Sequence, residues 1–129
     1  MKKSFIVVSG QRPDKDYTEE LMQVIRDTKL GAKQVITSWE DEQETSFVVV
    51  FDSKDIEQVS LAAHITSMCL YRFEQDVVLH VDENRRATLG DASGHVESIG
   101  QFVEVGEGEA QTLAGYTFDP IDGRYWAVK

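Results

Sequence analysis

The first 81 residues alternate between short β-branched runs and longer segments in which apolar residues recur at helical spacing. Runs typical of strands cover Ser4–Ser9, Gln34–Thr37, Thr45–Phe51 and Asp76–Val81, with helical segments after the first and the third of them. This β-α-β-β-α-β order predicts an α+β fold, in which a ferredoxin-like antiparallel sheet carries both helices on one face. The third run is almost wholly apolar, so we expect it near the centre of the sheet.

Both predicted helices have recognisable ends. Asp16 can cap the first helix, and Gly31 follows its last apolar residue, as is typical of a helix stop. Ser53 can cap the second helix, which we expect to run to about Arg72. Apolar positions of the second helix cover a wide arc, which indicates contact with the sheet and with another surface.

The last third of the chain has a different pattern. Seven of the nine glycines lie at or after Gly90 and separate short β-like runs. Tyr116–Phe118 and Arg124–Val128 flank Asp119–Gly123, where Pro followed by Asp-Gly is a strong signal for a hairpin turn. We expect this C-terminal hairpin region to extend the same sheet or to cover its open face. Because no linker or internal repeat interrupts the sequence, residues 1–129 are predicted to form one domain.

Acidic residues outnumber basic ones by 23 to 13, which gives a formal net charge of −10. A protein that binds the phosphates of nucleic acid would carry a basic stripe instead, so no nucleic-acid partner is predicted. The charge is compatible with a cationic ligand, with a surface that imitates nucleic acid, or simply with solubility.

Cysteine use and hydropathy predict a protein of the cytoplasm with no membrane partner. Cys69 is the single cysteine, so no disulfide forms within the chain. The longest apolar run, Phe47–Phe51, is five residues and far shorter than a membrane span. The apolar stretch near the N-terminus ends at Ser9, which makes it too short for a signal peptide.

Several common catalytic chemistries lack their residues in this sequence. His64, His80 and His95 are widely separated and show no metal-ligand spacing. Cys69 lies in an apolar helical segment, which is typical of a buried structural thiol. The sequence has neither a Gly-x-Ser-x-Gly elbow nor a phosphate-binding glycine loop followed by Lys. No metal and no cofactor is therefore predicted.

Polar side chains at the entrances of two apolar strands remain as candidates. Glu44 comes directly before the third predicted strand, and Glu74, Gln75 and Asp76 lie at the start of the fourth. Carboxylates at strand entrances are usually solvated, so position alone does not separate a functional role from a structural one.

The second of these segments resembles a motif of a known enzyme family. Phe73–Leu79 is similar to the Glu-Gln-Asp-x-Val-Leu segment of the T7-like phage S-adenosylmethionine lyases, long called S-adenosylmethionine hydrolases. Val7–Ser9 and Arg12 resemble the first strand of that family. Further segments follow the order and spacing of the family, namely Ile99–Val105, Gly108–Ala110, Gly115–Asp119 and Gly123–Val128.

The resemblance implies a small phage enzyme that destroys S-adenosylmethionine without a metal or cofactor. The methionine carboxylate of the substrate would attack the Cγ of the same molecule, releasing methylthioadenosine and homoserine lactone. The protein would hold the reactive conformer and exclude water, and such positioning supplies roughly 7–11 kcal/mol of a barrier at best. The family also implies a homotrimer with substrate between subunits, and an anti-restriction role in the host cytoplasm through loss of the methyl donor.

Carried over to matching positions, the resemblance implies roles for three residues. Glu44 falls where the family has a functional glutamate, and it would grip the ammonium or sulfonium group of the substrate. Gln75 matches the glutamine of the Glu-Gln-Asp motif and would contact substrate across a subunit boundary. Ser9 matches a serine at a strand end and would help to position the substrate. Glu74 and Asp76 keep their interpretation as solvated strand caps.

The sequence departs from the family pattern after the first helix. The family has a tyrosine two residues after the glycine that ends this helix, whereas here Lys33 occupies that position. Either Tyr17, Trp39 or Tyr71 takes the place of that ring, or the site is altered. The second helical region is also longer than in the family.

Two other classes of function remain open at this point. An acidic protein that imitates DNA would block a nucleic-acid enzyme by contact and would leave S-adenosylmethionine intact. A non-catalytic trimeric protein would bind S-adenosylmethionine or a nucleotide without turnover, an alternative that Lys33 motivates. Formation of product separates the lyase from both alternatives.

Overall fold

The computed structural model describes residues 3–129, which contain three α-helices, a short π-helix and eight strands. The helices are α1 (Thr18–Thr28), α2 (Ile56–Ser67) and α3 (Glu107–Ala110), and the π-helix Met68–Arg72 continues α2. The strands are β1 (Ser4–Ser9), β2 (Gly31–Trp39), β3 (Glu42–Phe51), β4 (Val78–Val81), β5 (Arg86–Gly90), β6 (Val96–Val105), β7 (Gly115–Asp119) and β8 (Arg124–Val128). The predicted β-α-β-β-α-β order of the first 81 residues is confirmed.

The strands form a closed antiparallel barrel in the order β1-β3-β2-β7-β8-β6-β5-β4. β4, β1, β3 and β2 lie side by side, but neither outer strand of this group is an edge. β2 pairs onward with β7, and β4 pairs onward with β5. The predicted fold class, an open ferredoxin-like sheet extended by a C-terminal hairpin, is therefore wrong.

The long strand β6 closes the barrel because its two halves pair with different strands. Its first half pairs with β5, and Phe102–Val105 pair with β8. A β-bulge lies at the change of partner, since Ala87 pairs with Gly100 whereas Thr88 pairs with Ser98. Closure gives partners to backbone groups that an open sheet would leave exposed at its edges. Local sequence pattern predicts strands, but it does not reveal that two distant edges meet.

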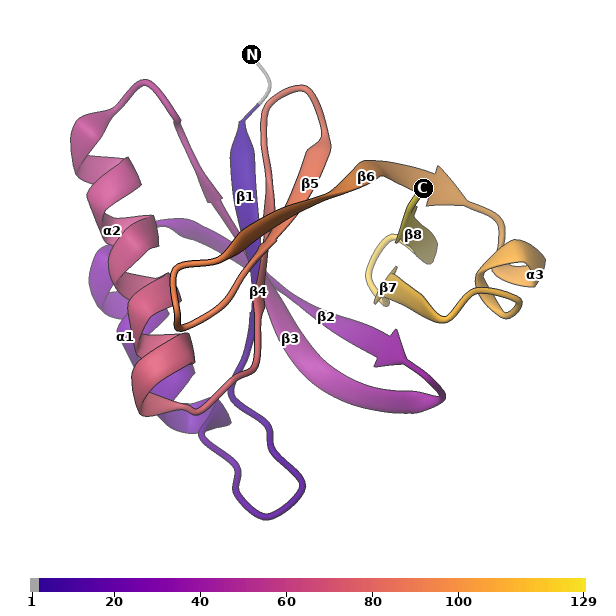
Figure 1. Cartoon of the computed structure of the whole chain (residues 1–129), viewed down its shortest axis with the longest axis horizontal. Coiled ribbons are helices and arrows are strands. Elements are labelled where there is room, and N and C mark those ends of the chain that lie inside the picture. Colours follow the sequence, from indigo (N-terminus) through magenta and orange to yellow (C-terminus); the bar gives the residue numbers. More distant parts are fainter. Residues whose placement is uncertain (1–2) are drawn as a thin grey trace.

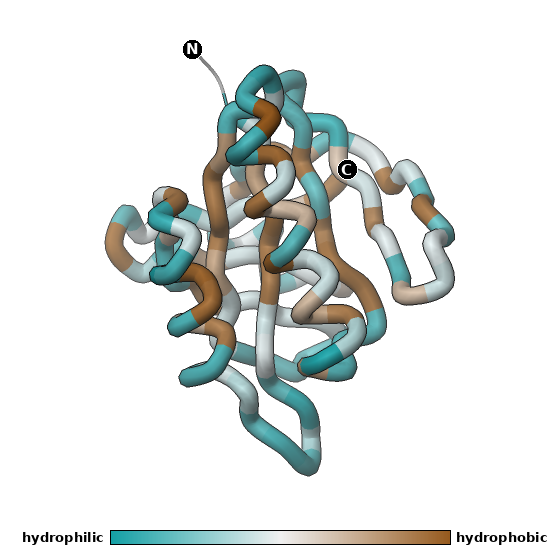
Figure 2. Tube along the Cα trace, turned by 90° about the vertical axis from the view of Figure 1, so that its left-hand side faces the viewer, coloured by the Kyte–Doolittle hydropathy of each residue, from teal (hydrophilic) through white to brown (hydrophobic). Residues whose placement is uncertain are grey.

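Side chains alternate along each strand, so the sheet has two buried faces. α1 and α2 cover the outer face, where Leu21 and Ile65 pack against strand residues such as Val49 (Figure 1). A separate apolar cluster fills the interior of the barrel, and its most buried members are Phe5, Val7, Val81, Ala87 and Phe102. Figure 2 shows the hydrophobic segments along the strands and hydrophilic segments at many of the turns.

The ends of α1 differ in detail from the prediction. The first helical residue is Thr18, and its backbone N–H donates to the Asp16 carboxylate at 2.9 Å. Asp16 therefore binds the first turn from two residues before the helix, while the cap position itself is Tyr17. At the other end, Lys29 takes the left-handed conformation with φ 62, and Gly31 already begins β2.

The start of α2 also lies later than predicted. Asp55 rather than Ser53 caps the helix, because the Asp55 carboxylate accepts a hydrogen bond from the Gln58 N–H at 3.2 Å. The helical segment runs to Arg72 as expected, with its last five residues in π-helical form. Within residues 3–129, the helices are all too short or too polar to cross a membrane.

We expect Gly100→Ala to destabilise the closure of the barrel. Gly100 has φ 127, and an added Cβ would meet the carbonyl oxygen of Lys129. Strain of this kind costs about 1–3 kcal/mol, so the free energy of unfolding in a denaturant titration should fall by that amount. Gly31→Ala is the matched control, because its Cβ has no neighbour within 4 Å. Equal stability of the two variants would contradict this account of closure.

Candidate functional site

The three residues that the sequence predicts for the site lie together at one end of the barrel. Ser9 is the last residue of β1 and pairs with Ser46 of β3. Glu44 lies two residues before Ser46, so the alternation of β3 places both side chains on the inner face. Gln75 lies in the segment between the π-helix and β4, and it reaches the chain just after β1.

Gln11 joins these residues through hydrogen bonds. Its backbone N–H donates to the Ser9 hydroxyl at 3.1 Å, and its backbone carbonyl accepts from Gln75 Nε2 at 3.1 Å. Its side-chain Oε1 accepts from the Thr45 N–H at 2.6 Å. Gln11 thus connects Ser9, Gln75 and the part of β3 that carries Glu44. No periodicity or motif marks this glutamine, because its partners meet only in the folded chain.

Glu44 has an electrostatic environment that favours its neutral form more than water does. Partial burial raises the pKa of the Glu44 carboxyl above its ordinary value, the Ser9 hydroxyl opposes this rise by hydrogen bonding, and the Glu42 charge adds to it. The Ser9 hydroxyl also donates to the Thr45 carbonyl at 3.2 Å. An approaching cation would favour the charged form of Glu44 and would bind to it.

Hydroxyl groups line the inner face next to Glu44. Thr37 is the residue of β2 opposite Glu44, and its Oγ1 lies 2.7 Å from the Ser46 Oγ. Ser46 and Ser9 are buried, with 2% and 6% of their surface exposed. This end of the barrel interior therefore contains polar groups that are already positioned, next to one partly buried carboxylate.

Glu74 and Asp76 hold the loop that carries Gln11. The Glu74 carboxylate accepts from Lys15 Nζ and from the Tyr17 hydroxyl, each at 3.1 Å, and these contacts lower the pKa of Glu74. Arg12 donates to the Glu74 carbonyl at 2.5 Å and lies 3.5 Å from the Asp76 carboxylate. Both acidic side chains are exposed. Their contacts are with Arg12, Lys15 and Tyr17 rather than with residues of the inner face.

Lys33, which departs from the family pattern, and the three rings that could replace the family tyrosine lie in different places. Tyr17 packs on Phe73 with ring centroids 5.3 Å apart, close to the Gln75 segment. Trp39 and Tyr71 are mostly exposed, and the Tyr71 hydroxyl donates to a carbonyl in the loop between β5 and β6. Lys33 pairs with Asp119 and Asp122, and its partner in β3 is Val48, four residues from Glu44. The lysine is thus held away from the carboxylate.

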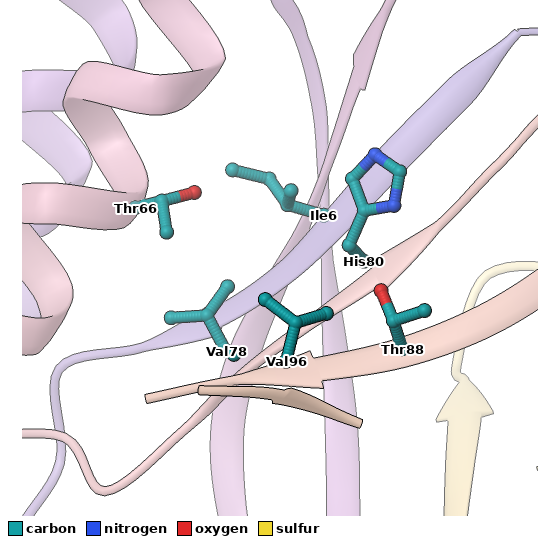
Figure 3. A pocket seen from close by; sticks show the side chains of 7 residues that line it. Ile6, Thr66, Val78, His80, Thr88 and Val96 are labelled. Atoms are coloured by element: carbon teal, nitrogen blue, oxygen red, sulfur yellow. The ribbon is translucent and has the colours of Figure 1, made fainter. Parts of the chain in front are cut away.

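A pocket lies on the outer face of the sheet, between α2 and β4–β6. It has a volume of about 330 Å³, and Figure 3 shows Ile6, Val78 and Val96 with the ring of His80 at its side. Burial lowers the pKa of His80, which keeps this ring neutral at neutral pH. The pocket lining contains no carboxylate, so it offers nothing to attract a cationic substrate.

The other candidate metal ligands and nucleophiles do not gather into a site. Within residues 3–129, no three His, Cys, Asp or Glu residues are placed to hold a metal ion. Cys69 is buried in the helix-side core, and burial raises the pKa of its thiol to about 12. As the sequence predicts, it is a structural thiol rather than a reactive one.

The comparison with protein families gives one match that covers most of the chain. The model of the S-adenosylmethionine lyase family matches residues 9–129. The chain belongs to this family. The family resemblance predicted from the Phe73–Leu79 segment is therefore confirmed, and the family name indicates a lyase with S-adenosylmethionine as its substrate. No curated protein matches the chain.

Among the three predicted site residues of this S-adenosylmethionine lyase family member, Glu44 is the one that carries a carboxylate, and this carboxylate is partly buried. S-adenosylmethionine carries a sulfonium and an ammonium group, so a site for it needs negative charge next to groups that exclude water. Glu44 supplies the charge, and the adjoining Ser9 and Ser46 are buried. The match by itself assigns no residue of this lyase-family chain to a role.

We expect Ser9→Ala to raise the pKa of Glu44 further. The substitution removes the hydrogen bond that favours the carboxylate, while the burial that favours the neutral acid remains. Carbon-detected NMR titration of the glutamate carboxyls measures this pKa, and Glu44→Gln identifies the resonance. A Glu44 pKa that is unchanged or lower in Ser9→Ala would contradict the geometry described above.

Proposed function

We propose that this chain is an S-adenosylmethionine lyase formed by one domain over residues 1–129. The substrate carboxylate oxygen forms a bond to its own Cγ, and the bond between Cγ and sulfur breaks. The bonding electron pair goes to sulfur, which gives neutral methylthioadenosine, and the remaining fragment is homoserine lactone. The reaction consumes no water and needs no external base, which suits a site whose candidate residues are one glutamate, one glutamine and one serine.

The proposed role of Glu44 is to hold the ammonium group of the substrate. The carboxylate and the sulfonium lose their charges as they react, so a protein charge that stabilised the sulfonium would oppose the reaction. The ammonium keeps its charge throughout, and gripping it fixes the methionine chain without that penalty. The partly buried position of Glu44 supports this role. Exclusion of water strengthens the ion pair between Glu44 and the ammonium group, and it favours a reaction in which the substrate carboxylate and sulfonium neutralise each other.

Gln75 and Ser9 are proposed to complete the contacts with the methionine end. The Nε2 of Gln75 already donates to the carbonyls of Gln11 and Phe73, which leaves its Oε1 as an acceptor for an ammonium proton. Ser9 lies beside Glu44, and its hydroxyl favours the charged form of the carboxyl by lowering the pKa of Glu44. The joint contacts of Gln11 with both residues support this arrangement, since they fix the distance between the acceptors.

The decisive experiment incubates the purified protein with S-adenosylmethionine and identifies the products. We expect methylthioadenosine and homoserine lactone, and we expect Glu44→Gln to lower kcat/KM at least about tenfold, the effect of losing one charged hydrogen bond. Glu97→Gln is the control, because Glu97 is an exposed carboxylate of β6, a strand that does not pair with β3.

Other outcomes of this assay contradict the proposal in distinct ways. Homoserine that forms directly and takes its oxygen from labelled water would mean attack by water rather than by the substrate carboxylate. Binding of S-adenosylmethionine without any product would make the chain a binding protein. Unchanged turnover in Glu44→Gln would remove this residue from the site.

We also propose that the chain forms a homotrimer with the site near a subunit boundary. This trimer would act against host restriction in the host cytoplasm. Ile56 and Val59 of α2 are 85% and 39% exposed, which supports burial of this helix face in an assembly. Destruction of the methyl donor would deprive host methylation and the restriction systems that use it. Light scattering during size-exclusion chromatography should give three times the chain mass of 14.6 kDa. A monomer mass at micromolar concentration would overturn the trimer and leave the lyase proposal standing.

A further inference from the structure

The pocket between α2 and β4–β6 lies on the outer face of the sheet, whereas the candidate site lies on the inner face. Neighbouring strands form its floor, and Thr66 of α2 faces them from the helix side (Figure 3). The floor residues are Ile6, Val78, His80, Thr88, Gly90 and Val96. Because successive side chains of a strand point to opposite faces, the sheet separates this pocket from Ser9 and Glu44.

The pocket exists because the helices cover the sheet unevenly. The core between the helices and the sheet is built mainly from α1, α2, β1 and β3, and Val78 is its only buried member from β4–β6 among the described residues. The far wall is nevertheless tied to the helical side. The Tyr71 hydroxyl of the π-helix donates to the Ala92 carbonyl in the β5–β6 turn at 2.7 Å. The space is therefore preformed rather than filled by core packing.

The lining of the pocket is apolar and carries no fixed charge. Ile6, Val78 and Val96 supply most of its carbon surface, and it contains no Asp, Glu, Lys or Arg. Burial lowers the pKa of His80, so its ring is neutral at neutral pH. A charged ligand would lose its hydration here without gaining a counter-charge, which is costly. The lining therefore favours a neutral ligand.

Two polar side chains of the floor offer hydrogen bonds to a ligand. His80 and Thr88 are direct partners across β4 and β5, and Figure 3 shows the ring and the hydroxyl on the same side of the pocket. Among residues 3–129, neither side chain has a hydrogen-bond partner. The Thr66 hydroxyl, by contrast, already donates to the Ala62 carbonyl at 3.0 Å. A neutral imidazole and a hydroxyl each provide a donor and an acceptor.

We propose that this pocket binds a neutral, compact molecule made of an apolar ring and one hydroxyl group, of which phenol is the simplest example. The ring would lie against Ile6, Val78 and Val96. The ligand hydroxyl would donate to a ring nitrogen of His80 and accept from the Thr88 hydroxyl. The pocket volume of about 330 Å³ is sufficient, because about 150 Å³ already holds benzene and ligand pockets begin at about 300 Å³.

Methyl NMR with phenol tests the proposal, because the ring current of a bound phenol shifts the signals of nearby methyl groups. Titration with phenol should shift the methyl signals of Val78 and Val96 in a saturable way. Val7 packs in the barrel interior and is the internal control, so its signals should stay in place. The absence of a saturable shift at Val78 and Val96, or an equal shift at Val7, would overturn the proposal.

Comparison of phenol with toluene tests the hydrogen bond, since toluene has a methyl group in place of the hydroxyl. His80→Phe keeps a ring but removes its nitrogens. In this variant the ratio of phenol affinity to toluene affinity should fall about fivefold, as expected for one lost hydrogen bond. His64→Phe is the matched control, because His64 is exposed on α2 and lies outside the lining. An unchanged ratio in His80→Phe would overturn the proposed role of this ring.

Gly90→Leu tests the place of binding. An added Cβ at Gly90 would meet only the Val96 Cγ2, at 4.0 Å, so a side chain fits here and occupies the pocket. The saturable shift of the Val78 signals by phenol should be lost, while far-ultraviolet circular dichroism confirms that the variant is folded. Phenol binding that survives Gly90→Leu would place the ligand elsewhere and overturn the proposal.

A titration with S-adenosylmethionine separates this pocket from the candidate site. The Val78 and Val96 signals should not respond, because the lining offers nothing to a cation. A saturable response would make the pocket part of the substrate site and would overturn the proposal. Since none of these measurements involves turnover, a protein that binds phenol but forms no methylthioadenosine would refute the lyase proposal alone.

Discussion

β6 pairs with β5 through its first half and with β8 through its second half, and this double pairing determines the rest of the structure. Without it, the strands from β4 to β2 would form an open sheet with helices on one face and water on the other. With it, the second face becomes the interior of a barrel, where Phe5 and Phe102 are buried. The bulge opposite Ala87 and the positive φ of Gly100 make the change of partner sterically possible.

Closure also determines where charge can be placed. An inner-face residue in the middle of a strand is surrounded by apolar side chains. A residue at a strand end is partly shielded from water and can still be reached by a ligand. Glu44 lies near one end of the interior, and Lys33 pairs with Asp119 farther along it. The interior thus has a partly buried carboxylate near one end and an ion pair farther along.

The sequence predicted the strands and helices well because their signals are local. Alternation, helical spacing and the hairpin at Asp119–Gly123 each depend on neighbours along the chain, and the structure has elements at all these places. The family motif led to Ser9, Glu44 and Gln75, which the fold brings to one end of the barrel. Their roles stay a prediction. Gln11 was missed because its significance lies in hydrogen bonds to residues 34 and 64 positions away.

The amino-acid sequence by itself determined the order of the elements and membership of a lyase family, because both are written in local patterns and motif order. The tertiary structure alone decided that the sheet closes, that Gln11 connects the predicted residues, and that His80 lines a pocket beside α2. The physical reason is that strand pairing and side-chain contacts join residues far apart in the chain. Their free energy depends on the whole set of partners, and no short window of sequence contains that set.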